Sequence, residues 1–179
     1  SSGCIQGPND PILKPAAANK MDYEVEVAMV IGKKGKNISE DKAQDHVFGY
    51  CIVNDVSERS WQKERGGQWI KGKSIAGPCG PYLVTKDEIK DINNLNLSLD
   101  VNGERRQTGN TERMIFNFNF LISHISQFMT LYPGTIITTG TPAGTAMEMD
   151  VPKFLQTGDK LSLKVDQLGE QNHIVEEGD

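Results

Sequence analysis

Two acidic residues, two positions apart, interrupt an otherwise apolar run, and this pattern constrains the fold more than any other part of the chain. Glu24 and Glu26 lie within residues 23–31, whose β-branched and aromatic residues are typical of a strand. Alternate side chains of a strand point to the same face, so the two carboxyl groups project together, with Cα atoms roughly 6.5–7 Å apart. Adjacent carboxylates on an apolar strand are unfavourable unless something neutralises them. The segment therefore predicts either a bound divalent cation or a strand with one face in water.

Length and composition indicate how many domains the chain forms and which kinds of partner it can have. The chain has 179 residues, which we expect to form a single domain spanning residues 1–179. The net charge of −5 and the pI of about 5.3 argue against nucleic acid and anionic membranes as partners. No apolar run reaches the roughly 20 residues that a membrane span requires. We therefore expect a protein whose partner is a small molecule.

The ends of the chain and its cysteines bear on its location in the cell. The three cysteines lack CxxC spacing and indicate reduced thiols. Reduced thiols are typical of a cytoplasmic protein, or of the mitochondrial matrix if the source is eukaryotic. The chain opens on Ser1 without a signal-like segment, and we expect the native N-terminus to lie upstream.

The remaining pattern predicts more strands than helices. Strands are expected over residues 23–31, 47–53, 95–101, 135–139 and 161–165. Asn102-Gly103 predicts a two-residue hairpin turn. Helical segments are expected over residues 39–46, 57–62 and 118–129, and the proline-rich segment before residue 20 is expected to be loop. Because the strands do not alternate regularly with helices, we expect an α+β fold with a β-rich mixed sheet or roll.

Further polar residues follow the predicted strands. Asp55 ends an apolar strand, where a third carboxylate could complete an oxygen-ligand site with Glu24 and Glu26. Lys73 lies among glycines that allow the backbone to approach a ligand closely. The run TGTPAG at residues 139–144 predicts a tight turn lined with hydroxyl groups, which suits a carboxylate or an oxyanion.

Together these segments resemble the fumarylacetoacetate hydrolase family. The matching pieces, in order, are DYEVE, GYCIVNDVSERSWQKERGGQWIKGKS, GPYLVTKDEI, NGERRQTGNTERMIF, FMTLYPG and TGTPAG. They extend over nearly the whole chain from Pro11 onward. The run SERSWQKERGGQWIKGKS is most similar to the branch acting on 2,4-diketo-3-deoxy sugar acids and acylpyruvates. The resemblance implies the family's β-rich α+β roll, of the fumarylacetoacetase C-terminal-like type, and a homodimer.

The resemblance also implies roles for individual residues. Glu24, Glu26 and Asp55 match the family's ligands for Mg²⁺, which in some members is Mn²⁺ or Ca²⁺. Lys73 matches the active-site lysine. Gln62 and Thr141 match positions that contact the substrate. The implied activity is Mg²⁺-dependent hydrolysis of a C–C bond in a 2,4-diketo acid, because a divalent ion and a nearby ammonium would stabilise the enolate that this cleavage leaves.

Two departures from the family pattern leave other functions open. In family members a histidine and a glutamate on an N-terminal lid activate water. We expect that lid to lie upstream of Ser1, because no segment of the given sequence has an equivalent pair. The run after Ser74 is also shorter than the family's usual Asp-Thr continuation. Oxaloacetate decarboxylation or tautomerisation, or a hydratase or isomerase reaction, would use the same enolate site. A catalytically silent protein that binds metal and keto acid is the alternative from another class.

The three histidines are expected to have other roles. We expect His46 at a helix end, His124 packed on an apolar helical face, and His173 in a polar C-terminal tail.

Overall fold

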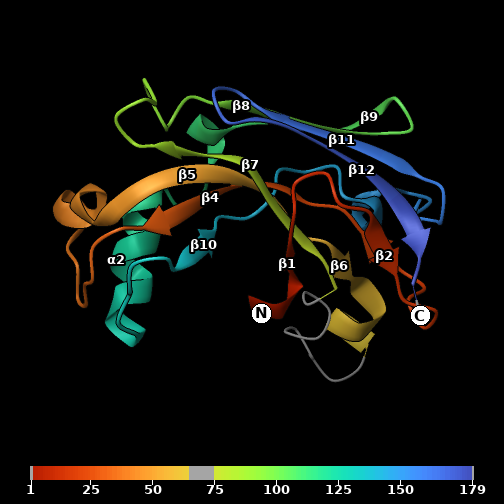
Figure 1. Cartoon of the computed structure of the whole chain (residues 1–179), viewed down its shortest axis with the longest axis horizontal. Coiled ribbons are helices and arrows are strands. Elements are labelled where there is room, and N and C mark those ends of the chain that lie inside the picture. The colour runs from red at the N-terminus through yellow and green to blue at the C-terminus, as the bar shows by residue number, and fades with distance from the viewer. Residues whose placement is uncertain (1, 65–74, 179) are drawn as a thin grey trace.

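The computed structural model describes residues 2–64 and 75–178, which form two five-stranded sheets and a two-stranded ribbon (Figure 1). The strand order of the first sheet is β1-β7-β5-β4-β10. Its strands span Ile5–Gln6 (β1), Gly77–Thr85 (β7), Val47–Asn54 (β5), Val25–Ile31 (β4) and Ile136–Thr138 (β10). β1 runs parallel to β7, whereas the other neighbouring strands are antiparallel. The sheet is therefore mixed, as expected from the sequence.

The second sheet has the strand order β2-β12-β11-β8-β9. Its strands span Ile12–Lys14 (β2), Gly169–Glu177 (β12), Lys160–Val165 (β11), Asn96–Val101 (β8) and Glu104–Asn110 (β9). β2 is parallel to β12, and the remaining pairs are antiparallel. A separate ribbon pairs β3 (Met21–Asp22) with β6 (Ser57–Glu58). The ribbon joins the segment before β4 to the segment after β5.

The helices of the described segments are short. α2 spans Phe118–Phe128, and the Asn117 side chain caps it by accepting a hydrogen bond from the Phe120 N–H. The other helical segments are the 3-10 helices Ser2–Cys4, Glu40–His46, Thr111–Arg113 and Ala146–Glu148, and the π-helix Ser60–Glu64. None of the helices that the structure describes has the length and apolar character needed to cross a bilayer.

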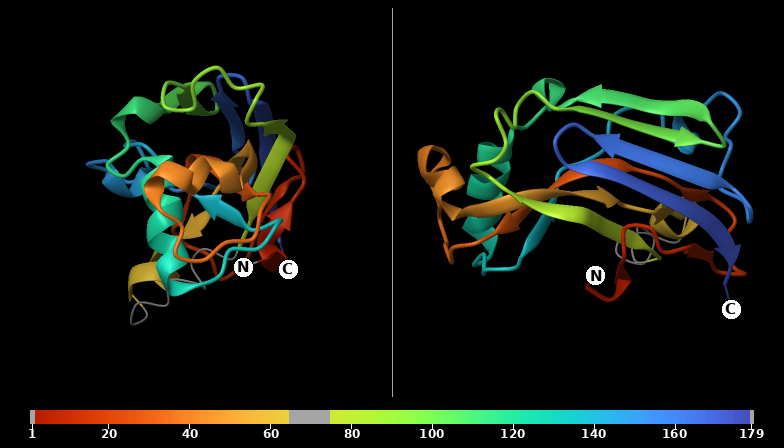
Figure 2. Two further views of the ribbon diagram at one scale, coloured as in Figure 1. Left: turned by 90° about the vertical axis from the view of Figure 1, so that its left-hand side faces the viewer. Right: turned by 45° about the horizontal axis from the view of Figure 1, so that its top comes forward.

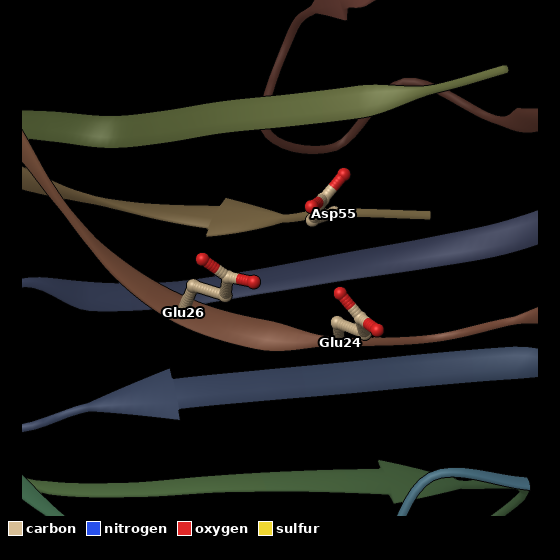
Figure 3. A group of neighbouring side chains, drawn as sticks. All are labelled: Glu24, Glu26 and Asp55. Atoms are coloured by element: carbon tan, nitrogen blue, oxygen red, sulfur yellow. The ribbon is translucent and has the colours of Figure 1, made fainter. Parts of the chain in front are cut away.

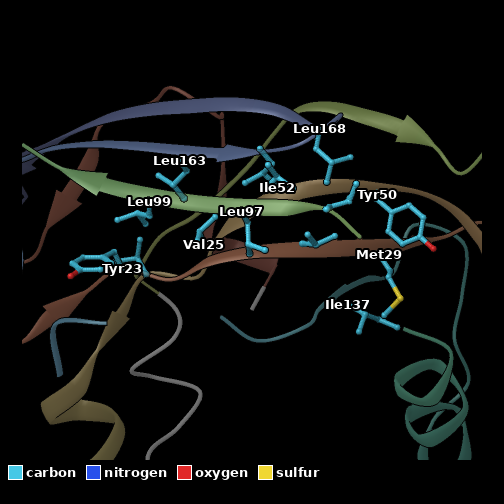
Figure 4. Close-up of a cluster of buried hydrophobic side chains, with 14 of the residues drawn as sticks. Tyr23, Val25, Met29, Tyr50, Ile52, Leu97, Leu99, Ile137, Leu163 and Leu168 are labelled. Carbon is cyan, nitrogen blue, oxygen red and sulfur yellow. The ribbon is translucent and has the colours of Figure 1, made fainter. Parts of the chain in front are cut away.

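The two sheets stack around a shared hydrophobic core (Figure 2). Side chains of β4 and β5 meet those of β8 and β11 in this core; Val25, Met29, Tyr50, Ile52, Leu97, Leu99 and Leu163 are among them (Figure 4). Because side chains alternate along a strand, the residues between these lie on the opposite, outer face of the first sheet. There Ala28, Val30, Cys51 and Val53 form a second, smaller apolar cluster. Glu26 shares this outer face.

Most predicted elements are confirmed. The five predicted strands correspond to β4, β5, β8, β10 and β11, and the helix over residues 118–129 corresponds to α2. The Asn102-Gly103 turn joins β8 to β9, and its two residues have φ values of 53° and 78°. Both values lie in the left-handed region that a two-residue hairpin of this kind requires. The α+β assignment with mixed sheets and short helices is therefore confirmed.

Several local predictions were wrong. The segment before residue 20, which was expected to be loop, contains β1 and β2. The Gly/Pro-rich strand β7 was not among the predicted strands. The predicted helical turn is present as the π-helix Ser60–Glu64, which carries Trp61 and Gln62. Residues 57 and 58 form β6, so Ser57 is not its cap. His124 is exposed and stacks on the Phe120 ring at a centroid distance of 5.6 Å. The strands β1, β2 and β7 were missed because each of them pairs with a segment far away in the chain, and a local sequence pattern does not reveal such pairing.

His173 is buried in β12 and does not lie in a polar tail. Its Nδ1 is 3.1 Å from the Asp10 carbonyl oxygen, and its Nε2 is 3.1 Å from Oε1 of Gln171. The Nε2 of Gln171 donates to the Gly80 carbonyl at 2.8 Å and so connects the second sheet to the first. Burial lowers the pKa of His173, and the hydrogen bond to Asp10 only partly opposes this effect. His173 is therefore held in its neutral form.

This burial predicts a pH dependence of stability. The folded protein binds a proton at His173 less readily than the unfolded chain does, so stability is present above the unfolded pKa of about 6.5 and is lost as pH falls through the folded pKa. Replacing His173 with Gln removes this titration. Urea unfolding followed from about pH 7.5 to pH 5 should show a smaller loss of stability in His173→Gln than in the parent protein. An unchanged slope in His173→Gln would contradict the prediction.

Candidate active site

The three predicted carboxylate ligands lie together at the adjoining ends of β4 and β5 (Figure 3). Glu24 precedes β4, Glu26 lies within it, and Asp55 directly follows β5. One carboxylate oxygen of each residue lies within 4.8 Å of the others. The β4–β5 register explains this convergence, because Val25 pairs with Asn54 and the Asp55 N–H donates to the Glu24 carbonyl at 3.0 Å.

The oxygen cluster has the chemistry of a site for a hard divalent cation. Glu24 and Glu26 are only 7% and 2% exposed. Buried carboxylates at this separation repel one another and favour a positive charge between them. Oxygen ligands from carboxylates are those that Mg²⁺ and Ca²⁺ take in proteins. The donor set therefore fits such an ion.

Arg59 connects this cluster to a buried acid that the sequence pattern did not single out. Its Nη2 donates to Oε1 of Glu24 at 2.6 Å, and its Nε donates to Oδ2 of Asp22 at 2.9 Å. Burial alone would lower the pKa of Arg59, but the two carboxylates raise it above its usual value. Asp22 is fully buried and also accepts from the Ala146 N–H at 2.8 Å. Arg59 thus fixes one metal-ligand candidate against the core of the protein.

Gln62 also lines the site. It lies on the π-helix Ser60–Glu64 and is 1% exposed. Its Oε1 accepts from Nη1 of Arg59 at 3.1 Å, which orients the amide. Its Nε2 is buried and has no hydrogen-bond partner among the residues that the structure describes. A buried donor without a partner is unfavourable, so this position suits an oxygen of a bound ligand.

The turn after β10 closes another side of the site. The Gly140 N–H donates to Oε2 of Glu26 at 2.8 Å. The Thr141 hydroxyl donates to the Val25 carbonyl at 2.8 Å and accepts from Nε2 of Gln107 at 2.9 Å. Thr141 therefore lines the site, while its hydroxyl hydrogen holds the turn against β4. The predicted contact between Thr141 and a substrate stays a prediction.

These groups surround one cavity of about 440 Å³. Its lining includes Glu24, Glu26, Asp55, Arg59, Gln62 and Thr141. Glu148 also lines it and accepts hydrogen bonds from the Gly144 and Thr145 N–H groups. Five of the six predicted site residues are thus brought together. The sixth, Lys73, lies outside the described residues, and its role stays a prediction.

Asp22, Arg59 and Gln107 belong to the site and were not predicted as site residues. Asp22 and Arg59 stand within the family-like runs DYEVE and SERSW, which was the available signal. The burial of both residues was not visible in the sequence. Gln107 lies on β9 of the second sheet, and its Oε1 accepts from the Val25 N–H at 3.1 Å. No local pattern connects it with β4.

A sequence model described as "Fumarylacetoacetate (FAA) hydrolase C-terminal" matches residues 2–176. A curated relative from Burkholderia cenocepacia, named "Putative hydrolase", is 52% identical over 170 residues. The match covers 93% of this chain and 60% of the relative. The chain therefore spans about three fifths of the length of this curated relative.

Solved structures show the same fold. A fumarylacetoacetate hydrolase from Exiguobacterium antarcticum is 38% identical with a TM-score of 0.94, covering 99% of this chain and 65% of that one. A 5-carboxymethyl-2-hydroxymuconate delta-isomerase from Mycobacterium smegmatis is 35% identical with a TM-score of 0.89. The match covers 99% of this chain and 67% of the isomerase. A maleylpyruvate hydrolase from Sphingobium sp. SYK-6 is 32% identical with a TM-score of 0.85. The match covers 98% of this chain and 63% of the hydrolase.

The contacts of Arg59 predict a large effect on stability. Arg59→Leu leaves the buried Asp22 carboxylate without its ion-pair partner, and breaking such a pair costs about 3–5 kcal/mol. Urea unfolding in the absence of divalent ions measures this loss. The double variant Asp22→Asn with Arg59→Leu should recover part of it, because no unpaired charge is left at Asp22. Arg105→Leu, which breaks an exposed pair with Asp100, is the control and should change stability far less. Parent-like stability of Arg59→Leu would contradict this role.

Proposed function

Because the chain belongs to the fumarylacetoacetate hydrolase family, we propose that it is a Mg²⁺-dependent hydrolase that cleaves a C–C bond in a 2,4-diketo acid. The family contains both hydrolases and isomerases. The observation that carries the proposal is the convergence of Glu24, Glu26 and Asp55, with one oxygen of each within 4.8 Å of the others. Mg²⁺ is the proposed ion because it is hard and retains open positions for water and substrate. Mn²⁺ or Ca²⁺ would suit the same oxygens.

The proposed substrate is an acylpyruvate or a diketo-deoxy sugar acid. Maleylpyruvate hydrolase, one of the solved structures with this fold, is named for hydrolysis of an acylpyruvate. The run SERSWQKERGGQWIKGKS supports the same branch. Both substrate classes carry a 2-keto carboxylate, the group whose two oxygens can approach a divalent ion together.

Each residue of the site has its own role in the proposed reaction. Glu24, Glu26 and Asp55 would hold the ion. The ion would supply positive charge to the oxygens of the keto acid, where negative charge develops as the C–C bond breaks. The Gln62 Nε2 would donate to a substrate oxygen, since Arg59 already occupies its Oε1. The Lys73 ammonium is proposed to stabilise the same developing charge.

An isomerase reaction is the second candidate function. The likeness to a 5-carboxymethyl-2-hydroxymuconate delta-isomerase favours it. Isomerisation passes through an enolate but needs no activated water. The same holds for decarboxylation and tautomerisation of oxaloacetate. The carboxylates, Gln62 and Lys73 would have the same roles in each of these reactions, so the choice of substrate separates them.

A substrate panel tests the proposal. Acylpyruvates, diketo-deoxy sugar acids, oxaloacetate and a hydroxymuconate should be assayed with Mg²⁺ and with a chelator. We expect Mg²⁺-dependent cleavage of a 2,4-diketo acid, detected by the release of pyruvate. Glu24→Ala, Glu26→Ala and Asp55→Ala should each abolish turnover. Turnover of the hydroxymuconate alone would support the isomerase, and no metal-dependent turnover of any compound would contradict the enzymatic proposal.

Calorimetric titration separates loss of the ion from loss of the fold. Each carboxylate variant should bind Mg²⁺ at least about 100-fold more weakly, since changes outside the ligand shell already cost 10–100-fold. Glu88→Gln, which removes an exposed carboxylate, should bind Mg²⁺ as the parent does. Unchanged affinity in all three variants would contradict the metal assignment.

Lys73→Met tests the role of the ammonium. Methionine keeps much of the aliphatic length of lysine and removes the charge. We expect kcat to fall by about 100-fold or more, as when one preorganised donor is removed from an oxyanion site, and to change more than KM. Mg²⁺ affinity should be retained because an ammonium is not a ligand. A parent-like kcat would show that Lys73 does not stabilise the reacting charge.

A further inference from the structure

Two cysteines lie side by side on the outer face of the first sheet, outside the machinery described above. Cys51 lies on β5 and Cys79 on the neighbouring strand β7, with their Sγ atoms 3.5 Å apart. Cys79 pairs with Val53 across the two strands. Because Val53 and Cys51 are two positions apart, their side chains share one face of the sheet. The two thiols therefore meet across the strand pair.

The two thiols differ in access to solvent. Cys51 is 2% exposed, whereas Cys79 is partly exposed. Both pack in the apolar cluster with Ala28, Val30 and Val53. The hydrogen bond between the thiols lowers the pKa of Cys79 and raises that of Cys51, and burial further raises the pKa of Cys51. Cys79 is the more accessible and more acidic thiol, and Cys51 is positioned behind it.

We propose that Cys51 and Cys79 are a redox-active pair that a hydroperoxide converts into an intramolecular disulfide. The Cys79 thiolate attacks one oxygen of hydrogen peroxide, the O–O bond breaks, and Cys79 becomes a sulfenic acid with release of hydroxide. The Cys51 sulfur then attacks the Cys79 sulfur, and the S–O bond breaks. The leaving hydroxide takes the Cys51 proton and departs as water. The hydroxide from the first step takes up the proton that Cys79 lost on ionising. Overall, the two thiols are oxidised to one disulfide and the peroxide is reduced to two waters.

The disulfide would close a loop of the chain that carries residues of the active site. Val53 pairs with Cys79 on one side and with Glu26 on the other, so a single side chain separates the thiols from the carboxylate cluster along the sheet. The connection between Cys51 and Cys79 also carries Asp55, Arg59 and Gln62. A disulfide would join the two ends of this connection and restrict the unfolded chain. The oxidised protein should therefore unfold at higher urea concentration than the reduced protein.

Peroxide titration with peptide mapping tests the proposal. The reduced parent protein is treated with hydrogen peroxide, and its thiols are counted and its peptides mapped by mass spectrometry. We expect the free thiols of Cys51 and Cys79 to disappear together, while the protein mass falls by two hydrogens. Mapping should show one cross-linked peptide that contains both cysteines, and dithiothreitol should restore the two thiols. Cys4→Ser should form the same link. The urea midpoint should rise on oxidation of the parent protein.

Two variants make the outcome decisive. In Cys51→Ala, which keeps a small apolar side chain in the cluster, Cys79 should react with dimedone as a sulfenic acid and the urea midpoint should not rise. In Cys79→Ala, Cys51 should remain a thiol at the same peroxide concentration. A link between Cys79 and Cys4, links only between separate molecules, or persistence of both thiols under excess peroxide would each overturn the proposal.

Discussion

Gathering buried carboxylates at the ends of two neighbouring strands is the constraint on which the rest of this structure depends. Charged groups removed from water lose hydration, and groups of like sign repel one another. The protein meets this cost with fixed donors around Glu24 and Glu26. Arg59 donates to Glu24, and the Gly140 N–H donates to Glu26. These contacts hold the oxygens in a geometry that suits a small dication before any ligand arrives.

The supports for the cluster come from distant parts of the chain. Asp22 anchors Arg59 and also accepts from the Ala146 N–H, so it joins the segment before β4 to the helix after the β10 turn. Gln107 reaches from the second sheet to the Val25 N–H and the Thr141 hydroxyl. The stacking of the two sheets therefore positions the turn that closes the site. A loss of packing between the sheets would disturb the site without changing any residue that lines it.

Local sequence patterns predicted those features of the fold and the site that neighbouring residues determine. The period of two placed Glu24 and Glu26 on one face, and the apolar run before Asp55 placed that residue at a strand end. The Asn102-Gly103 turn could be predicted because few residue pairs adopt its backbone conformation. The Asp22–Arg59 pair and Gln107 could not be predicted as parts of the site. Their roles depend on contacts between segments far apart in the chain, as does the pairing that makes strands of β7 and β12.

The central claim is that Glu24, Glu26 and Asp55 together bind one divalent cation. Crystals grown with Mn²⁺ in place of Mg²⁺ test it directly, because anomalous scattering locates the ion independently of the protein atoms. The account predicts one strong anomalous peak bound by oxygens of all three residues, and, in the matching Mg²⁺ crystal, ligand distances of about 2.0–2.1 Å. A peak that contacts only one of the three carboxylates, or no peak between them at saturating Mn²⁺, would contradict it.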